Sequence, residues 1–318
     1  MVVVLALFVG ACSHGTGGVS RSKRSRSPSH SSPSSPQPLR VSVHRIARLP
    51  SALQDPATAS QGQAVYALGG LDSADSSVSS VLRILPSGVS SVGQLNLPTH
   101  DAAAASLGGK VFLFGGGHLT SYRTIERLDL AAGTVTTVAN LPAPLSDVSV
   151  AVIGTTAYIV GGYTGSAFSD RILSFTGGKV RVVGHLPLGL RYTAVAASEG
   201  TLLIAGGLST TGPTRNVYRF SPADSRVSKI GRLPYPLMHA GAAILSGVMC
   251  IVGGLGRRLR PHRQILVVDA GGAVRVAGSL PQPLSDAGVA GEGGRLIVVG
   301  GRGPSGPVSS VLSVESQR

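Results

Sequence analysis

Short apolar runs that end in a pair of glycines recur along the chain at a nearly constant interval. The six runs are 64–68, 111–114, 157–160, 202–205, 249–252 and 296–299. The glycine pairs after them, Gly69-Gly70, Gly115-Gly116, Gly161-Gly162, Gly206-Gly207, Gly253-Gly254 and Gly300-Gly301, are separated by 46, 46, 45, 47 and 47 residues. Apolar runs of this length bounded by glycine are typical of buried β-strands. The pattern therefore predicts an internal structural repeat.

Each interval also holds a Leu-Pro pair and two further runs of β-forming residues. The pairs are Leu49-Pro50, Leu97-Pro98, Leu141-Pro142, Leu186-Pro187, Leu233-Pro234 and Leu280-Pro281. Between a glycine pair and the next Leu-Pro pair lie runs such as 80–85 with 88–93, or 217–220 with 226–230. Each repeat is therefore predicted to contain four short strands. Such a unit needs neighbours to cover both of its faces.

Six four-stranded units of this length fit the blades of a β-propeller formed by residues 40–318. The stretch 40–50 aligns with the last strand of a repeat, and 308–315 aligns with a third strand. The N-terminal strand is therefore predicted to close the last blade, which leaves no unpaired edge in the ring. The expected fold is all-β, a six-bladed β-propeller with four antiparallel strands per blade.

The repeat resembles the Kelch family of propellers, whose motif is an apolar strand ending in Gly-Gly, followed by aromatic residues on the outer strands. The fourth repeat shows it best, with 203–207 (Leu-Ile-Ala-Gly-Gly) followed by Tyr218, Phe220 and Pro222. The aromatic residues are eroded in the other repeats, and tryptophan is absent. The resemblance implies a Kelch-like module that binds protein or carbohydrate, since enzymes are a minority in that family.

Composition agrees with this fold and excludes several other classes. With 44 glycines, 20 prolines, 42% hydrophobic and 13% charged residues, the chain is too apolar for disorder and too turn-rich for a helical bundle. Its two cysteines exclude a disulfide-rich scaffold and a cysteine-clustered metal site. No span reaches the roughly 20 apolar residues of a membrane helix. We expect no cofactor and no bound metal.

The first residues have the pattern of a targeting segment. An apolar run over 2–10 is followed by Ala11 and Cys12, which resembles a bacterial lipoprotein signal. The resemblance implies a signal segment over 1–12 with lipidation at Cys12, and a chance apolar terminus is the alternative. Residues 13–39, rich in Ser, Pro and basic residues, are expected to form a disordered tether. We expect an exported protein, anchored to the outer face of the membrane or secreted.

The chain is strongly basic, with 28 basic and 14 acidic residues and a net charge of +14. Four of the basic residues lie in the tether, so residues 40–318 hold 24 basic against 14 acidic groups, or +10. Nucleic-acid binders usually add aromatic stacking platforms or a basic helix, and aromatic residues are only 4% here. We therefore expect a protein or glycan partner rather than nucleic acid.

Counting back 14 residues from each glycine pair gives six equivalent positions at the mouth of the central channel. They are Asp55, Asp101, Asp147, Tyr192, His239 and Asp286. A repeated aspartate at a turn accepts backbone N–H bonds, which favours a scaffold role. Converging carboxylates could alternatively bind a cation or the hydroxyl groups of a ligand.

Three residues stand just before ring positions: Arg191, His100 and Met238. Together with Tyr192 and His239, which break the aspartate pattern, they differ from blade to blade. Polar groups that are specific to one blade at a concave mouth are better candidates for a binding site than repeated ones.

The loops after the glycine pairs are predicted to lie on the same face as the ring positions. One of them, 256–263, contains Arg257, Arg258, Arg260, His262 and Arg263. These groups could bind an anionic ligand, such as a carboxylate, sulfate or phosphate, by forked hydrogen bonds. A solvated, mobile loop is the favoured alternative, because most charge runs are of that kind. His44, His118 and His185 show no metal-ligand spacing and are predicted to be surface or loop residues.

No complete catalytic signature is found. Cys250 lies in an apolar strand and is interpreted as a small buried hydrophobic residue, which disfavours copper-radical chemistry. A strained nucleophile turn and a phosphate-binding glycine loop before a helix are both missing. The sequence favours a binding module. The alternative is a carbohydrate-active isomerase, mutarotase-like, that uses the aspartate ring and His239 as acid and base.

Overall fold

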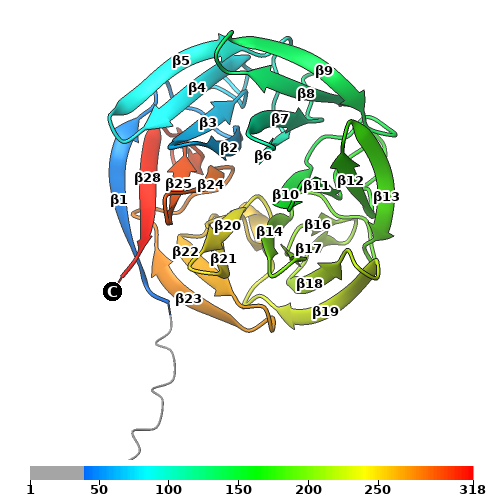
Figure 1. The fold of residues 1–318 in the computed structure, drawn as a ribbon. Helices are drawn as coiled ribbons and strands as arrows, with labels where there is room; N and C mark the ends of the chain where they lie inside the picture. The colour runs from blue at the N-terminus through cyan, green and yellow to red at the C-terminus, as the bar shows by residue number, and fades with distance from the viewer. Residues whose placement is uncertain (1–38, 318) are drawn as a thin grey trace, which may run out of the picture. The chain divides into compact units, whose positions relative to one another are not determined.

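The computed structural model describes residues 39–317, and most of them lie in six four-stranded antiparallel sheets. The sheets surround a central hollow as the blades of a propeller (Figure 1). Within residues 39–317 the single helical element is a 3-10 turn, η1 (Arg257–Leu259). The predicted all-β, six-bladed fold is confirmed.

Blades 1 to 3 are each built from four consecutive strands, ordered from the channel outward. Blade 1 holds β2 (Ala57–Gln61), β3 (Ala64–Leu68), β4 (Ser80–Leu85) and β5 (Gly88–Gln94). Blade 2 holds β6 (Ala103–Leu107), β7 (Lys110–Phe114), β8 (Thr124–Asp129) and β9 (Thr134–Asn140). Blade 3 holds β10 (Ser149–Ile153), β11 (Thr156–Val160), β12 (Arg171–Thr176) and β13 (Lys179–His185).

Blades 4 to 6 follow the same plan, with short hairpins added to two of their loops. Blade 4 holds β14 (Ala194–Ser198), β15 (Thr201–Ala205), β18 (Asn216–Ser221) and β19 (Arg226–Arg232), with the hairpin β16 (Leu208–Ser209) and β17 (Gly212–Pro213). Blade 5 holds β20 (Gly241–Leu245), β21 (Val248–Val252), β22 (Gln264–Val268) and β23 (Val274–Ser279). Blade 6 holds β24 (Gly288–Glu292), β25 (Arg295–Val299), β28 (Ser310–Ser316) and β1 (Val41–Arg48), with the hairpin β26 (Arg302–Gly303) and β27 (Gly306–Pro307).

The ring of blades is closed by strands from the two ends of the described chain. β1 pairs antiparallel with β28, in a register that runs from Val41 opposite Ser316 to Arg48 opposite Ser310. The two strands lie side by side at the rim of the propeller (Figure 1). The prediction that the N-terminal strand completes the last blade is confirmed.

The glycine pairs join each blade to the next one. In blade 5, Gly253 and Gly254 have φ values of 62° and 98°, which only glycine adopts readily. A Cβ atom on Gly253 would overlap the carbonyl oxygen of Leu284, which precedes blade 6, and Gly254 donates its N–H to that same oxygen at 2.8 Å. The equivalent bond is present at all six glycine pairs. The repeat therefore encodes the contact between neighbouring blades.

The leucine that precedes each ring position by six residues is buried between blades. Leu49, Leu141, Leu186, Leu233 and Leu280 are at most 4% exposed. The remaining Leu-Pro pair does not fit, because Leu97 is 53% exposed and Leu95 occupies the buried position. Leu95 donates its N–H to the carbonyl oxygen of Ser79, and each of the other five leucines donates its N–H to the equivalent carbonyl oxygen of its own blade. The expectation that Leu97-Pro98 stands in phase with the other pairs was wrong by two residues.

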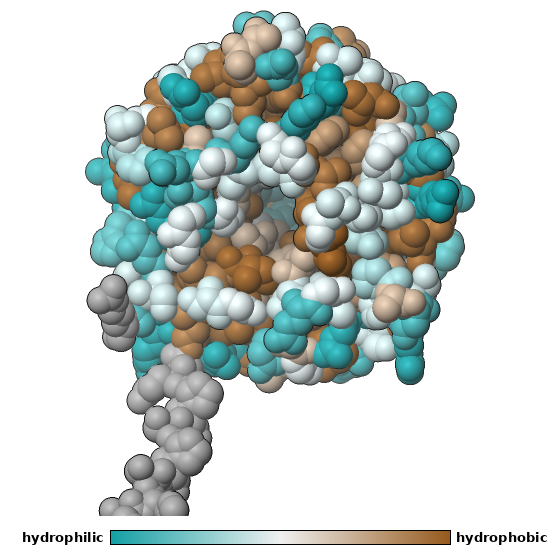
Figure 2. Space-filling model, in the orientation of Figure 1, coloured by the Kyte–Doolittle hydropathy of each residue, from teal (hydrophilic) through white to brown (hydrophobic). Residues whose placement is uncertain are grey.

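The core lies between the blades rather than at the centre. Six clusters of buried apolar residues fill the spaces between neighbouring sheets. Between blades 2 and 3, for example, the rings of Phe114 and Phe175 meet edge to face at 5.7 Å. The innermost strands are thereby left to line the channel with small residues. The central hollow is visible in the space-filling view (Figure 2).

Candidate functional site

The six ring positions converge where the innermost strands begin, and all six line a central channel cavity of about 150 Å³. All six residues have left-handed backbone conformations, with φ between 53° and 58°. Aspartate and histidine tolerate this conformation better than most residues, whereas it is unusual for a bulky residue such as Tyr192. The repeat therefore fixes one backbone geometry at the channel mouth, whichever side chain it carries.

A belt of hydrogen bonds joins the ring positions of successive blades. Backbone N–H groups donate to the carbonyl oxygen of the preceding ring residue in four cases: Asp55 to Asp286 (2.6 Å), Asp147 to Asp101 (2.7 Å), Tyr192 to Asp147 (3.1 Å) and Asp286 to His239 (3.1 Å). The N–H of Asp101 donates to the carboxyl oxygen Oδ2 of Asp55 at 2.8 Å. These bonds support a scaffold role for the ring backbone.

The residue before each ring position pairs with the residue after a glycine pair, so the loops share the face of the ring. The six bridges are Gln54 with Leu71, His100 with Gly117, Ser146 with Tyr163, Arg191 with Leu208, Met238 with Leu255, and Ser285 with Arg302. The loops after the glycine pairs were predicted to lie on the same face as the ring positions, and these bridges agree with that prediction.

Three aspartates from adjacent blades form an acidic group at the mouth. Burial, together with the negative charge of Asp101, raises the pKa of Asp55 well above its usual value. The same two causes, burial and Asp101, raise the pKa of Asp147 to about 7. Burial also opposes ionisation of Asp101, but hydrogen bonds from Asp55 and Asp147 outweigh it and lower the pKa of Asp101. Asp101 is therefore the most readily ionised member of the group.

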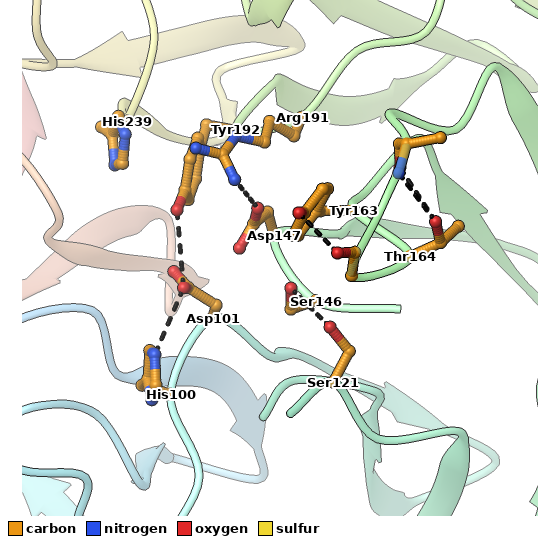
Figure 3. Close-up of polar contacts among 12 residues, drawn as sticks. His100, Asp101, Ser121, Ser146, Asp147, Tyr163, Thr164, Arg191, Tyr192 and His239 are labelled. Atoms are coloured by element: carbon orange, nitrogen blue, oxygen red, sulfur yellow. Dashed lines mark hydrogen bonds and ion pairs between the residues drawn. The ribbon is translucent and has the colours of Figure 1, made fainter. Parts of the chain in front are cut away.

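Arg191 contacts this acidic group and three aromatic rings. Its Nη1 donates to Oδ2 of Asp147 at 2.9 Å, and the Asp147 side chain is only 2% exposed. The guanidinium lies 5.2 Å from the ring centre of Tyr163, 5.0 Å from that of Phe168 and 4.8 Å from that of Tyr192. Cation–π contacts of this kind hold a planar guanidinium in one orientation. Arg191 and Asp147 point toward each other in Figure 3.

Tyr192 and His239 occupy neighbouring ring positions and stack on one another. Their ring centres are 3.5 Å apart, with 26° between the planes. The hydroxyl of Tyr192 reaches Oδ2 of Asp101 at 3.5 Å across the mouth, as Figure 3 shows. Burial raises the pKa of this phenol, so it stays protonated. His239 Nδ1 bonds to Oδ1 of Asp286, and the Ser285 hydroxyl donates to Oδ2 of Asp286 at 2.6 Å.

A groove of about 700 Å³ opens beside the ring between blades 2, 3 and 4. Its walls are the loops 117–121 and 163–166, and its floor includes His100, Asp147 and Arg191. Two hydroxyl groups meet there, since Ser121 of the first loop donates to Ser146, which precedes Asp147, at 3.1 Å (Figure 3). The groove therefore combines hydroxyl, aromatic and charged groups in one concave surface.

A second set of polar residues adjoins this groove at blades 1 and 2. The hydroxyl of Ser77 lies 2.8 Å from Nδ1 of His100 and 2.9 Å from Nδ1 of His118. Nε2 of His100 lies 3.5 Å from Oδ2 of Asp101. His118 is exposed, as predicted, but its contact with Ser77 was not expected. These contacts link the loop of blade 1 to the floor of the groove.

The structure brings together some of the predicted candidates and separates others. Arg191 and Tyr192 line the groove with Asp101 and Asp147. His239 and Asp286 line the channel cavity with Asp55 but not the groove. Met238 is buried, 5% exposed. The arginines of loop 256–263 belong to blade 5 and line neither the groove nor the channel cavity. The residue predicted to carry a lipid, Cys12, lies outside the described residues.

Several residues in and beside the groove were missed by the sequence interpretation. Ser121, Ser146, Tyr163 and Thr164 line the groove, whereas Ser77 and Phe168 contact its lining residues His100 and Arg191. Two of them could have been found by the repeat, because Ser146 stands before a ring position and Tyr163 stands directly after a glycine pair. The others depend on the paths of loops whose lengths differ between blades, and the repeat does not encode them.

Other features of the described residues bear on candidate chemistry. Over residues 39–317 no group of three or more histidine, cysteine, aspartate or glutamate side chains is arranged to hold a metal ion. Cys250 is fully buried, and burial raises the pKa of its thiol to about 12, as the interpretation of a small hydrophobic residue requires. In the same part of the chain, no helix has the length and apolar character needed to cross a membrane.

Comparisons with known proteins agree with the fold. Residues 98–142 match the family model described as the Kelch motif. The solved structure of YjhT is similar, with a TM-score of 0.74 over 85% of this chain and 99% of that chain, and 16% of the aligned residues are identical. At that identity the similarity shows the fold alone. No curated protein matches the chain.

Proposed function

The chain is a six-bladed β-propeller of the Kelch type, a fold that typically serves as an interaction module, and we propose that it binds a glycan. The glycan, a polyhydroxylated ligand, would bind in the groove on the ring face. The observation that carries the proposal is the groove itself. It lies where ring and loops meet, and the side chains that shape it belong to single blades rather than to the repeat. Departures from a repeat at a concave surface indicate a binding site.

The chemistry of the groove supports a glycan. Ser121, Ser146 and Thr164 offer hydroxyl groups that can donate and accept hydrogen bonds with sugar hydroxyls. Tyr163 adds an aromatic ring, held edge to face against Phe168 at 5.9 Å. A rigid ring beside hydroxyl groups suits the apolar and polar faces of a sugar ring. Arg191, tied to Asp147, adds a fixed positive group at the floor.

Binding is tested by titrating the full chain with a panel of neutral and acidic oligosaccharides and by following its melting temperature. A ligand that binds only the folded state raises that temperature. For any sugar that binds, Tyr163→Ala should weaken the affinity about tenfold or more, because it removes the stacking ring. Leu255→Ala, at the same repeat position in blade 5, is the matched control and should bind normally. Equal binding by both variants would contradict the groove as the site.

A second candidate function is the isomerisation of a sugar, and one observation favours it. Asp147 lines the groove with a pKa of about 7, which suits a group that both takes up and releases a proton near neutral pH. If the protein is a mutarotase-like isomerase, Asp147→Asn should lower the rate of anomer exchange at least about a hundredfold while sugar binding persists. The exchange rate is measured by NMR. Exchange at the wild-type rate in that variant would exclude the second candidate.

We further propose that the protein is exported and held at a membrane by lipid on Cys12. The proposal is supported by the sequence alone, namely the apolar run 2–10 followed by Cys12 and a tether rich in Ser and Pro. Labelling cells with a radioactive fatty acid should mark the wild-type protein and leave Cys12→Ser unlabelled. Label on both proteins, or on neither, would contradict the anchor.

A further inference from the structure

The loop 256–263 of blade 5 presents four arginines to solvent. Arg257, Arg258, Arg260 and Arg263 are all exposed. None of the ion pairs found within residues 39–317 involves them. Their charges are therefore free to meet anionic groups from another molecule.

The tip of this loop is folded in a defined way rather than extended. Gly256 donates its N–H to the carbonyl oxygen of Arg260 at 2.8 Å, which closes a tight turn around η1. Inside it, Arg258 and Leu259 both have left-handed backbone, with φ of 57° and 55°. Such a conformation is rare for a leucine, and here it holds Leu259 67% exposed among the arginines. The loop thus presents an apolar centre within a cationic rim.

The base of the loop is fixed by His262. Its ring stacks on that of Tyr235, with centres 3.9 Å apart and planes within 3°. The His262 ring also packs so closely on Gly256 that a Cβ atom on Gly256 would overlap Nε2 of His262. His262 also donates its N–H to Gly254 at 2.8 Å, and its carbonyl oxygen accepts the N–H of Leu284 at 3.0 Å. The arginines are solvated, as the sequence favoured, and these contacts give the base of the loop a defined conformation.

Two carboxylates on the ring face are engaged with other residues. Asp286 is bonded by His239 and Ser285. Arg302 of blade 6 pairs with Asp75 of blade 1 at 2.9 Å. Neither carboxylate forms an ion pair with the arginines of loop 256–263, which leaves these arginines available to a partner.

We propose that loop 256–263 is a docking surface for an acidic segment of a partner protein, with an apolar side chain of that segment placed on Leu259. Guanidinium groups bind carboxylates through forked hydrogen bonds, and the folded tip presents these groups without prior ordering. The exposed leucine at the centre fits a protein segment, since an interface combines an apolar centre with a polar rim. This site is separate from the groove of blades 2 to 4, so each can fail its test without the other.

The test measures binding of a fluorescein-labelled peptide of glutamates around a central phenylalanine pair to the full chain, by fluorescence anisotropy. The triple variant Arg257→Gln, Arg258→Gln and Arg260→Gln should weaken binding at least about tenfold. The control variant Arg226→Gln, Arg232→Gln and Arg275→Gln loses the same charge from exposed positions on the outer strands β19 and β23. It should change the affinity less than about twofold. An equal loss in both triple variants would overturn the proposal, because net charge alone would then explain binding.

Two single variants separate the apolar contact and the loop geometry from charge. Leu259→Ser should weaken binding of the phenylalanine peptide about fivefold and leave a peptide with glycine in place of phenylalanine unaffected. Gly256→Ala keeps every charge but displaces His262, so it should weaken both peptides. Wild-type affinity in Leu259→Ser and Gly256→Ala would overturn the proposal. Tighter binding to phosphatidylserine vesicles than to the peptide would overturn it as well, in favour of a membrane surface.

Discussion

Blades 1 to 3 and blades 4 to 6 carry different chemistry on the same backbone. In the first half every ring position is an aspartate, and the three carboxyl groups lie together at the channel mouth. In the second half the ring holds Tyr192, His239 and Asp286, and the charge is carried by arginines in exposed loops. All six ring positions nevertheless have φ between 53° and 58°. The repeat therefore specifies the backbone, and departures from the repeat specify what each half can bind.

The two halves also treat charge differently for a physical reason. Buried carboxyl groups that adjoin one another resist ionising together, so the pKa values of Asp55 and Asp147 are raised while that of Asp101, which accepts hydrogen bonds from both, is lowered. The arginines of the blade 5 loop are exposed, so water solvates their charges. One half is therefore suited to small polar ligands in a groove, and the other to an extended anionic partner on a convex loop.

The largest expected effect tests whether the backbone is the same in both halves. Gly115→Ala in blade 2 and Gly253→Ala in blade 5 each place a Cβ against the carbonyl oxygen of the next blade, at φ of 58° and 62°. Both should lower the free energy of unfolding by about 4 kcal/mol in denaturant titrations. Gly293→Ala, with φ of 57° and no atom near its Cβ, is the control and should cost about 1 kcal/mol. A large difference between the first two variants would break the comparison.

The next largest effect is the pH dependence of stability that Asp147 gives to blades 1 to 3. Because folding raises the pKa of Asp147 to about 7, the protonated form stabilises the fold, and this stabilisation is lost as pH rises from about 4 to about 7. The free energy of unfolding should fall by roughly 3 kcal/mol over that range. Asp147→Asn should flatten the decline.

The exposed Asp129 provides the control for this pH dependence. Hydrogen bonds from the N–H groups of Ala132 and Ala131 lower its pKa, the opposite of the shift at Asp147. Asp129→Asn should therefore leave the decline unchanged. A decline of equal slope in Asp147→Asn and the wild type would show that another group carries the proton.

A smaller effect is expected where the second half replaces aspartate. His239→Asn removes the stack on Tyr192 and the bond to Asp286 but keeps a residue that tolerates left-handed backbone. It should lower the free energy of unfolding at neutral pH by about 1 kcal/mol. A loss above about 3 kcal/mol would mean that the histidine, and not the backbone, holds this part of the ring.

The smallest effect concerns the exposed loop tips of the two halves. Leu119 in blade 2 is 88% exposed, and Leu259 in blade 5 is 67% exposed. Leu119→Ser and Leu259→Ser should each change the free energy of unfolding by less than about 0.5 kcal/mol. Any loss of binding in Leu259→Ser would then reflect the interface, whereas a clear destabilisation would assign this leucine to the fold.

Most of the architecture was predictable because it is repeated six times. The spacing of the glycine pairs located every blade, and the count of 14 residues found six positions that share one backbone conformation. The Leu97-Pro98 pair shows the weakness of a single local match. Its sequence fits the pattern, but the buried position belongs to Leu95, which stands six residues before Asp101 as its counterparts do.

The site was predictable only in part, because its chemistry depends on contacts between loops. Arg191 and Tyr192 could be singled out as departures from the repeat. The aromatic residues that contact Arg191 come from the loop of another blade and are Tyr163 and Phe168. Tyr163 could have been found from its place after a glycine pair, but no spacing in the repeat relates Phe168 to Arg191. The raised pKa of Asp147 depends on burial and on Asp101, which are properties of the assembled ring.

The strand pairing that closes the ring has a consequence for biosynthesis. β1 leaves the ribosome well before its partner β28, which lies more than two hundred residues later in the chain. Contacts between such distant residues form slowly, and until then the edge of β1 can pair with other chains. Aggregation is therefore most probable during translation, and the protein should depend on chaperones more before its last blade is made than at any later time.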